Sequence, residues 1–161
     1  MSANSNRTTE EAAIRELVEN WAKAVRTQNL TGILANHSPE ILMFDVPPPT
    51  QSKGIEAYKK TWDLFFSWSR DSGVFDISEM NITAGNDVAF VTALMRCAGT
   101  EANGERIELE FRLTIGLRKI GGQWIVMHEH HSIPASGTYY DEPDVHSPEA
   151  IGPKNASTSS S

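Results

Sequence analysis

Three histidines and a glutamate form the most reactive cluster of side chains in the sequence. They occupy residues 128–131 within the stretch RLTIGLRKIGGQWIVMHEHHSIP, which runs from Arg112 to Pro134. Histidines in a sheltered site can act as general acids or bases near neutral pH. Two imidazoles two residues apart could instead bind a metal, but such a site needs further ligands. The remaining candidates for a third ligand are His37, Asp45 and His146, and the pattern favours none of them. We therefore expect neither a metal nor a cofactor.

The pattern around this cluster is typical of two strands joined by a tight turn. Apolar and polar residues alternate up to Gly121-Gly122, whose glycines can supply the positive φ angles of a hairpin turn. Strict alternation beyond the turn places His128 and His130 on the same face as Trp124. We predict His130 as a catalytic acid or base, with His128 and Trp124 contacting the ligand. The alternative for both histidines is a hydrogen-bonded place in the core.

The opposite face of the same predicted strand carries Glu129 and His131. Because strand side chains point alternately to the two faces of a sheet, these two residues should lie away from His130. We expect this face to contact a second sheet, which would be that of another copy of the chain.

Asp45 lies near the end of a short apolar run, ILMFDV, and is followed by three prolines. A carboxylate that apolar neighbours shelter from water is a good candidate for a general base. Alternatively, Asp45 is a turn residue that accepts backbone N–H groups ahead of the prolines. The sequence does not decide between these two roles.

Arg112 lies between two apolar residues, Phe111 and Leu113, in the first of the two predicted strands. A guanidinium group buried there would need an anionic partner or several acceptors. One hypothesis is that Arg112 anchors a carboxylate of a ligand. The structural alternative is an ion pair, for which the candidates are Glu108, Glu110 and Asp45.

An unusually aromatic helix is predicted from Ile55 to Trp68. Tyr58, Trp62 and Phe65 fall on one face of it at helical spacing. Such a face can form the wall of a pocket for a flat apolar ligand, although residues of this kind more often belong to the core. We predict Trp62 and Phe65 in the pocket wall, with Tyr58 as a further ligand contact.

The elements that would position these residues follow from periodicity. Apolar spacing predicts helices over residues 10–27, 30–36 and 55–68, the first capped by Thr8 with Glu11 as its capping-box partner. Alternation predicts strands over residues 41–46, 74–83, 88–98, 106–119 and 124–132. Helices first and antiparallel strands afterwards indicate an α+β fold, with helices on one face of a curved, mostly antiparallel sheet.

Composition limits the possible partners and location. The 161 residues fit one domain over residues 8–134, followed by a Ser-, Pro- and acid-rich segment, 135–161, that we expect to be a flexible tail. A net charge of −7 argues against nucleic acid as a partner, and one cysteine rules out an internal disulfide. Neither a membrane-spanning run nor a signal sequence is evident, so we expect a cytoplasmic protein.

Three stretches together resemble a known group of proteins: MFDVPPPTQSKG, NDVAFVTALMRCAGT and the stretch from Arg112 to Pro134. Over residues 10–134 the chain resembles the SnoaL-like, ketosteroid-isomerase-like members of the nuclear transport factor 2-like superfamily. The spacing from Trp124 through His128 and His130 to Ser132 is also similar to the association domain of calcium/calmodulin-dependent protein kinase II.

The resemblance implies a cone of helices over a curved sheet, an internal pocket for a small-molecule ligand, and a homodimer formed through the sheet. It is compatible with proton transfer by an isomerase, cyclase or dehydratase, with Asp45 or His130 as the base and Arg112 as the anion anchor. It is also compatible with a non-catalytic module for ligand binding or oligomerisation. The tyrosine and protonated aspartate of the ketosteroid isomerase oxyanion hole have no counterparts here, so the resemblance to true isomerases concerns the fold.

Overall fold

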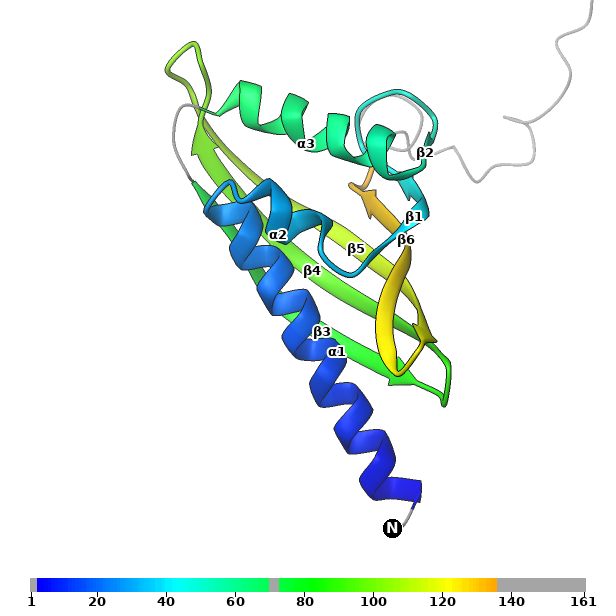
Figure 1. Cartoon of the computed structure of the whole chain (residues 1–161). Helices are drawn as coiled ribbons and strands as arrows, with labels where there is room; N and C mark the ends of the chain where they lie inside the picture. Colours follow the sequence, from blue (N-terminus) through cyan, green and yellow to red (C-terminus); the bar gives the residue numbers. More distant parts are fainter. Residues whose placement is uncertain (1–2, 70–72, 136–161) are drawn as a thin grey trace, which may run out of the picture.

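The computed structural model describes residues 3–69 and 73–135. Three helices precede or interrupt the strands: α1 (Ala3–Arg26), α2 (Leu30–Leu34) and α3 (Ile55–Trp68). Six strands follow the chain as β1 (His37–Phe44), β2 (Ser52–Lys53), β3 (Val74–Ala84), β4 (Val88–Thr100), β5 (Arg106–Ile120) and β6 (Gln123–Ser132). Figure 1 shows α1 lying along β3, while α3 crosses the other end of the sheet.

The strands form one sheet in the order β2-β1-β6-β5-β4-β3. All neighbouring strands are antiparallel except β1 and β6, which run parallel. This pairing places the first strand of the chain beside the last. The β5–β6 hairpin turns at Gly121 and Gly122, both with positive φ, as the sequence predicts. The prediction of an α+β fold with helices on a curved, mostly antiparallel sheet is confirmed.

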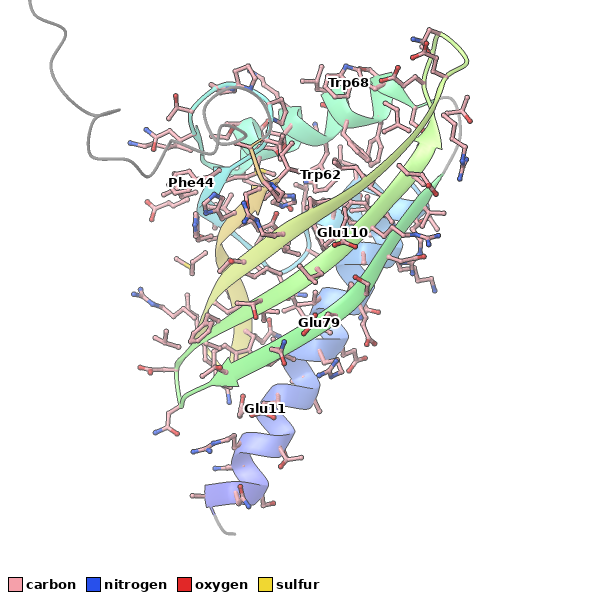
Figure 2. The ribbon with its side chains drawn as sticks, turned by 180° about the vertical axis from the view of Figure 1, so that it is seen from behind. Glu11, Phe44, Trp62, Trp68, Glu79 and Glu110 are labelled. Atoms are coloured by element: carbon pink, nitrogen blue, oxygen red, sulfur yellow. The ribbon has the colours of Figure 1, made fainter. Side chains whose placement is uncertain are left out.

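The core lies between the helices and the concave face of the sheet. Helix α1 contributes an apolar stripe that includes Ile14, Val18 and Trp21, because residues three and four apart share one helical face. Helix α3 adds Tyr58 and Trp62 from the other end of the sheet. None of the described helices covers the opposite face of the sheet, which Figure 2 shows, and Glu79 and Glu110 project from it.

The bounds of several elements differ from their predictions. Helix α1 begins at Ala3 rather than near residue 10, and Thr8 lies inside it, where its hydroxyl donates to the carbonyl of Asn4. The predicted cap is therefore wrong. Strand β1 begins at His37, four residues before the predicted start, and the two-residue strand β2 was not predicted. The first helical turns carry no apolar stripe, so periodicity could not reveal them.

A β-bulge at Met127 changes the face assignment of β6. Leu117 pairs with Val126, but the preceding residue of β5, Gly116, pairs with His128, so Met127 is an extra residue in β6. One extra residue exchanges the two faces for everything that follows it. Trp124 and Val126 face the core before the bulge, whereas Glu129 and His131 face it afterwards.

The prediction that Glu129 and His131 lie on the outer face for a sheet-to-sheet contact is therefore wrong, since both are buried inside the domain. The predicted C-terminal tail, apart from Ala135, lies outside the described residues, as do Tyr139, Tyr140 and His146. None of the helices in the described ranges combines the length and apolar character that crossing a bilayer requires.

Candidate functional site

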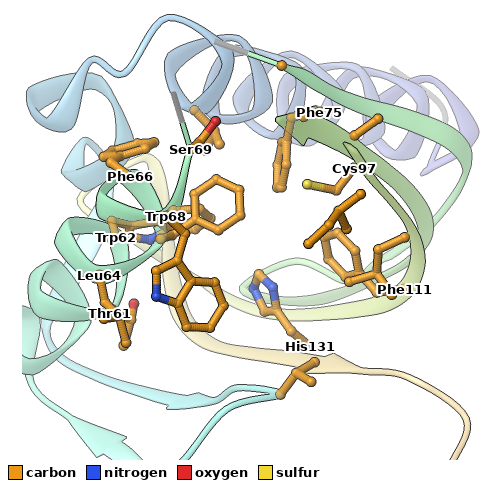
Figure 3. Close-up of a pocket in the computed structure, with 18 of the residues that line it drawn as sticks. Thr61, Trp62, Leu64, Phe66, Trp68, Ser69, Phe75, Cys97, Phe111 and His131 are labelled. Atoms are coloured by element: carbon orange, nitrogen blue, oxygen red, sulfur yellow. The ribbon is translucent and has the colours of Figure 1, made fainter. Parts of the chain in front are cut away.

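A pocket of about 330 Å³ opens between α3 and the sheet. Figure 3 shows Thr61, Trp62 and Leu64 of α3 on one side of it, Phe75, Cys97 and Phe111 of the sheet on the other, and His131 between them. The lining is mostly apolar and aromatic, as is usual for a small-molecule site. Its aromatic members are Trp62, Phe65, Phe66, Trp68, Phe75 and Phe111.

His131 is the histidine that lines this pocket. Its ring stacks on Phe111, with ring centroids 5.4 Å apart and an interplanar angle of 10°. The edges of Trp21 and Trp62 meet it at centroid distances of 6.1 and 6.2 Å. Aromatic neighbours on several sides fix the orientation of the imidazole.

Glu129 forms a hydrogen bond with His131 on the side of the ring away from the pocket. Nε2 of His131 lies 3.1 Å from Oε2 of Glu129, a carboxylate that is only 1% exposed. An ionised carboxylate only accepts hydrogen bonds, so Nε2 must carry the hydrogen. Nδ1 then keeps its lone pair, and none of the described residues donates a hydrogen bond to it.

The other carboxylate oxygen of Glu129 accepts two more hydrogen bonds. Oε1 lies 2.8 Å from Nε2 of His37 and 2.8 Å from the Tyr58 hydroxyl, which donates to it. The Tyr58 oxygen in turn accepts the indole N–H of Trp21 at 3.1 Å. One carboxylate therefore joins α1, β1, α3 and β6 through buried hydrogen bonds.

His37 is doubly protonated in this arrangement. Its Nδ1 lies 2.8 Å from the carbonyl oxygen of Ala35, and its Nε2 lies 2.8 Å from Oε1 of Glu129. Both oxygens are acceptors, so both ring nitrogens must donate. His37 and Glu129 thus form a buried ion pair.

The pKa values of the two acids in the network move in opposite directions. Burial alone raises the pKa of Glu129, but the hydrogen bonds and positive charge of His131 and His37 outweigh it and lower that pKa to about 2. Burial, followed by the nearby Glu129 charge, raises the pKa of Tyr58 well above its usual value. At neutral pH Glu129 is therefore an anion, and the Tyr58 hydroxyl keeps its proton and donates a hydrogen bond.

Three of the predicted site residues line the pocket. Trp62 and Phe65 form part of its wall, and Asp45 lies at its edge, half-buried, where its carboxylate accepts the backbone N–H of Val46 at 2.8 Å. Tyr58 lies on the same helical face as predicted, but its hydroxyl is committed to the network behind the pocket rather than to the pocket itself.

The other predicted site residues lie elsewhere, and the expectation that Asp45, Arg112 and His130 face one cavity is wrong. Arg112 and His130 are exposed on the outer face of the sheet, where Arg112 Nε donates to the Ser132 hydroxyl at 3.0 Å. His128, which follows the bulge, shares this outer face with His130, and its Nδ1 lies 2.6 Å from the carbonyl oxygen of Leu42.

Trp124, predicted as a ligand contact, faces the core but lies outside the pocket lining, and its indole donates to Glu10 of α1. Three residues at the centre of the site were missed, for two reasons. Glu129 and His131 were assigned to the wrong face because of the bulge, and His37 was considered only as a metal ligand. Among the described residues, no group of three His, Cys, Asp or Glu side chains is arranged to hold a metal ion.

Comparison with known proteins supports this description. The family model described as a SnoaL-like domain matches residues 14–136. An NTF2-like protein of unknown function from Pseudomonas putida KT2440 has a similar structure, with 35% identity, a TM-score of 0.73, and coverage of 80% of this chain and 89% of that one. No curated protein shows significant similarity to the sequence.

Two more distant structures share the fold alone. A ketosteroid isomerase-like protein from Erwinia carotovora atroseptica SCRI1043 is 17% identical, with a TM-score of 0.67 and coverage of 78% of this chain and 96% of that one. The association domain of CaMKII from C. elegans is 16% identical, with a TM-score of 0.63 and coverage of 80% and 98%.

The fold and the site define a cone-shaped α+β protein with an aromatic pocket and a buried His–Glu network behind it. The match over most of its length shows that the chain belongs to the SnoaL-like family within the NTF2-like superfamily.

Proposed function

We propose that this SnoaL-like protein binds a small, flat, mostly apolar molecule and transfers a proton on it, as isomerases, cyclases and dehydratases do. His131 is the acid–base group, and Glu129 is its positioning residue. The observation that carries the proposal is the hydrogen bond from His131 Nε2 to Glu129, because it leaves Nδ1 of a pocket-lining imidazole without a partner among the described residues.

The proposed chemistry needs only these groups and the substrate. Nδ1 of neutral His131 takes a proton from a carbon next to a carbonyl group, and the electron pair of the broken C–H bond moves onto the carbonyl oxygen. The resulting imidazolium is stabilised by the Glu129 carboxylate and returns the proton to carbon. A sheltered, mostly apolar site strengthens each of these electrostatic interactions.

The indole N–H of Trp62 supports a ligand with an oxygen at one end. This nitrogen is buried and has no hydrogen-bond partner among the described residues, although the ring lines the pocket. An unpaired buried donor costs about 1–3 kcal/mol. A carbonyl oxygen that reached it would accept the bond and carry developing negative charge beside His131, whose ring centroid lies 6.2 Å from that of Trp62.

The pocket favours an uncharged ligand over a carboxylate. Arg112, the predicted anion anchor, lies outside the lining. Among the described lining residues the one Lys or Arg side chain is Arg26, whose guanidinium donates to the Phe75 carbonyl at 2.8 Å and lies 3.6 Å from Asp76. The half-buried Asp45 is the second candidate for a proton-transfer group, acting from the edge of the pocket.

Deuterium exchange into 2-tetralone tests the proposal. This flat bicyclic ketone has acidic C–H groups next to its carbonyl, and its loss of α-protons in D₂O can be followed by NMR. The wild-type protein should accelerate the exchange, and His131→Gln should remove the acceleration while retaining a donor to Glu129. The matched control is His130→Gln, which changes the neighbouring residue on the outer face and should leave the rate unchanged.

The alternative outcomes are equally specific. Exchange that survives His131→Gln but is lost in Asp45→Asn would transfer the acid–base role to Asp45. Binding of 2-tetralone, seen as shifted NMR signals of the pocket, without accelerated exchange would favour a ligand-binding module. Neither binding nor exchange with this and related uncharged aromatic ketones would contradict the proposed ligand class.

We also propose that two copies of the chain associate through the outer face of the sheet. Phe90 and Leu94 of β4 lie on this face, with Phe90 50% exposed, and Phe44 of β1 lies beside His130 on the same face. A contact between two copies of the same face has twofold symmetry, so each residue of one copy meets its counterpart region on the other. The similarity in fold to the CaMKII association domain agrees with a role of this fold in assembly.

A further inference from the structure

The apolar side of β5 that faces the core continues beyond the point where the core ends. Alternate residues of a strand share a face, so Ile107, Leu109 and Phe111 point to the same side of the sheet, and all three line the pocket. Phe111 is only 5% exposed, whereas Leu109 and Ile107 are 37% and 42% exposed. This apolar stripe therefore runs from the inside of the pocket out to its mouth.

Helix α3 shows a matching change on the other side of the pocket. Trp62 is buried, whereas Leu64 and Trp68, which also line the pocket, are 45% and 52% exposed. Figure 3 shows Leu64 and Trp68 across the pocket from Phe111. The carbonyl of Trp68 accepts the backbone N–H of Ala102 at 3.1 Å, so α3 ends beside the turn that leads into β5. The exposed ends of the two apolar walls therefore lie at the same end of the sheet.

His131 lies at the closed end of this groove. It pairs with Leu113, and its ring stacks on Phe111. A strand rises about 3.2–3.4 Å per residue, so the stripe extends roughly 13 Å from Phe111 to Ile107. Strand β6 stops at Ser132, so none of the described strands flanks β5 on that side along this part of the groove. A ligand that reaches His131 and is longer than the closed part of the pocket would leave along the groove.

The charges of the lining favour an uncharged end for such a ligand. Glu101 lines the pocket at its open end, where it forms a β-bridge with Ser69, the residue that follows α3. The guanidinium of Arg26 is engaged by Phe75 and Asp76. A carboxylate at the far end of the ligand would therefore meet a like charge, whereas an alkyl end would meet apolar side chains.

We propose that the ligand carries an unbranched apolar chain, which leaves the pocket between α3 and β5 and covers Trp68, Leu109 and Ile107. The substrate class is then a carbonyl compound with its carbonyl group at His131 and an uncharged alkyl chain of several carbons. The groove is continuous with the pocket, so one ligand covers apolar side chains that proteins rarely leave exposed together. This inference rests on the proposed function, because it names the class of substrate for the same pocket.

Alkyl phenyl ketones of increasing length test the inference through binding alone. Acetophenone and hexanophenone share the phenyl ring and the carbonyl group and differ only in the length of the alkyl chain. Isothermal titration calorimetry of the wild-type protein should give an affinity that rises about twofold to fourfold for each added methylene group, the larger figure applying to full burial. Hexanophenone should therefore bind at least about tenfold more tightly than acetophenone.

Substitutions in the groove show whether the alkyl chain lies there. Ile107→Ser combined with Leu109→Ser should bring the ratio of the two dissociation constants close to one. The matched control is Val88→Ser combined with Ile120→Ser, which removes two well-exposed apolar side chains outside the pocket lining and should keep the wild-type ratio. Both double variants should have similar melting temperatures, so that a lost gain in affinity is not caused by unfolding.

The outcomes separate this inference from the proposed reaction. A ratio near one in the wild type, a wild-type ratio in the groove variant, or no binding of either ketone would overturn the inference. A gain that disappears as the protein concentration rises would assign the groove to a second copy and overturn it as well. Chain-length dependence without deuterium exchange into 2-tetralone would support the inference and contradict the proton transfer, whereas exchange without chain-length dependence would do the reverse.

Discussion

Glu129 links the stability of the molecule to the acid–base group in its pocket. Its carboxylate accepts hydrogen bonds from His37, Tyr58 and His131, which come from three separate elements. Buried charge is costly unless it is paired and hydrogen-bonded. The same bonds that satisfy Glu129 also fix the tautomer of His131, so the site cannot be altered there without affecting the fold.

Replacing Glu129 by glutamine should destabilise the protein strongly. The change keeps the shape of the side chain but removes the negative charge, which leaves the His37 imidazolium buried without its anion. Breaking a buried pair in this way costs about 3–5 kcal/mol. Urea unfolding followed by circular dichroism measures the loss. Glu16→Gln, on the exposed side of α1, is the matched control and should change the free energy of unfolding by less than about 0.5 kcal/mol.

Acid should unfold the protein over a defined pH range. The pKa of Glu129 falls from 4.5 to about 2 in the folded state, so its contribution to stability is fully present above pH 4.5 and is lost as the pH falls towards 2. That contribution amounts to roughly 3 kcal/mol. Stability measured by urea titration should decrease between these values in the wild type. If Glu129→Gln showed the same decrease, other carboxylates would be its cause.

The residues of the pocket wall were easier to predict than those of the network. Trp62 and Phe65 follow from helical spacing, which survives small errors in the ends of a helix. His131 and Glu129 depend on the register of a strand, where one extra residue reverses the outcome. Both faces of β6 carry polar residues after Met127, so its hydrophobic pattern does not reveal the reversal.

The backbone at Gly73 packs closely against the backbone of β4 at Ala98 and Gly99, beside the pocket. Gly73 precedes β3, lies in the pocket wall, and runs beside β4. A Cβ atom at Gly73 would lie 1.9 Å from the carbonyl oxygen of Ala98 and 2.9 Å from the Cα atom of Gly99. Because both neighbours are backbone atoms, only a shift of the two segments could accommodate a side chain.

Gly73→Ala should therefore destabilise the protein by about 2 kcal/mol or more, as an overpacked core position does. Thermal unfolding should show the loss as a lower melting temperature. Gly104→Ala is an informative comparison, because the added Cβ would meet nothing within 4 Å there and only the positive φ of 91° would oppose it. Gly73→Ala should be the more damaging change, and the opposite order would contradict the packing seen in the structure.

At the scale of the whole molecule, the order of helices and strands was largely predictable. Long strands such as β4 and the part of β5 from Phe111 onward could be predicted from alternation, because every second residue there is buried. The pairing of β1 with β6 joins segments about 90 residues apart, and local patterns carry no information about it. The resemblance to the superfamily supplied the overall shape, whereas the position of each polar side chain had to come from the structure.

Phe90→Glu should convert a dimer into a monomer. The new charge would stand on the outer face of β4, where two sheets in contact would bury it. Light scattering should give about twice the mass of one chain for the wild type and the mass of a single chain for the variant. Ile120→Glu, at the exposed tip of the β5–β6 hairpin, should leave the mass unchanged. A monomeric wild-type protein at micromolar concentration would refute the proposed association.

The extra residue Met127 shifts β6 by one position, so that every side chain after it points to the opposite face of the sheet. With the inserted residue, Glu129 and His131 face the core, where His131 lines the pocket, and His130 faces the solvent. A relative with the same four residues but without this bulge would direct His128 and His130, rather than Glu129 and His131, towards its core. Matching this four-residue motif between relatives therefore identifies the residues that face the pocket only when the register of the strand is known.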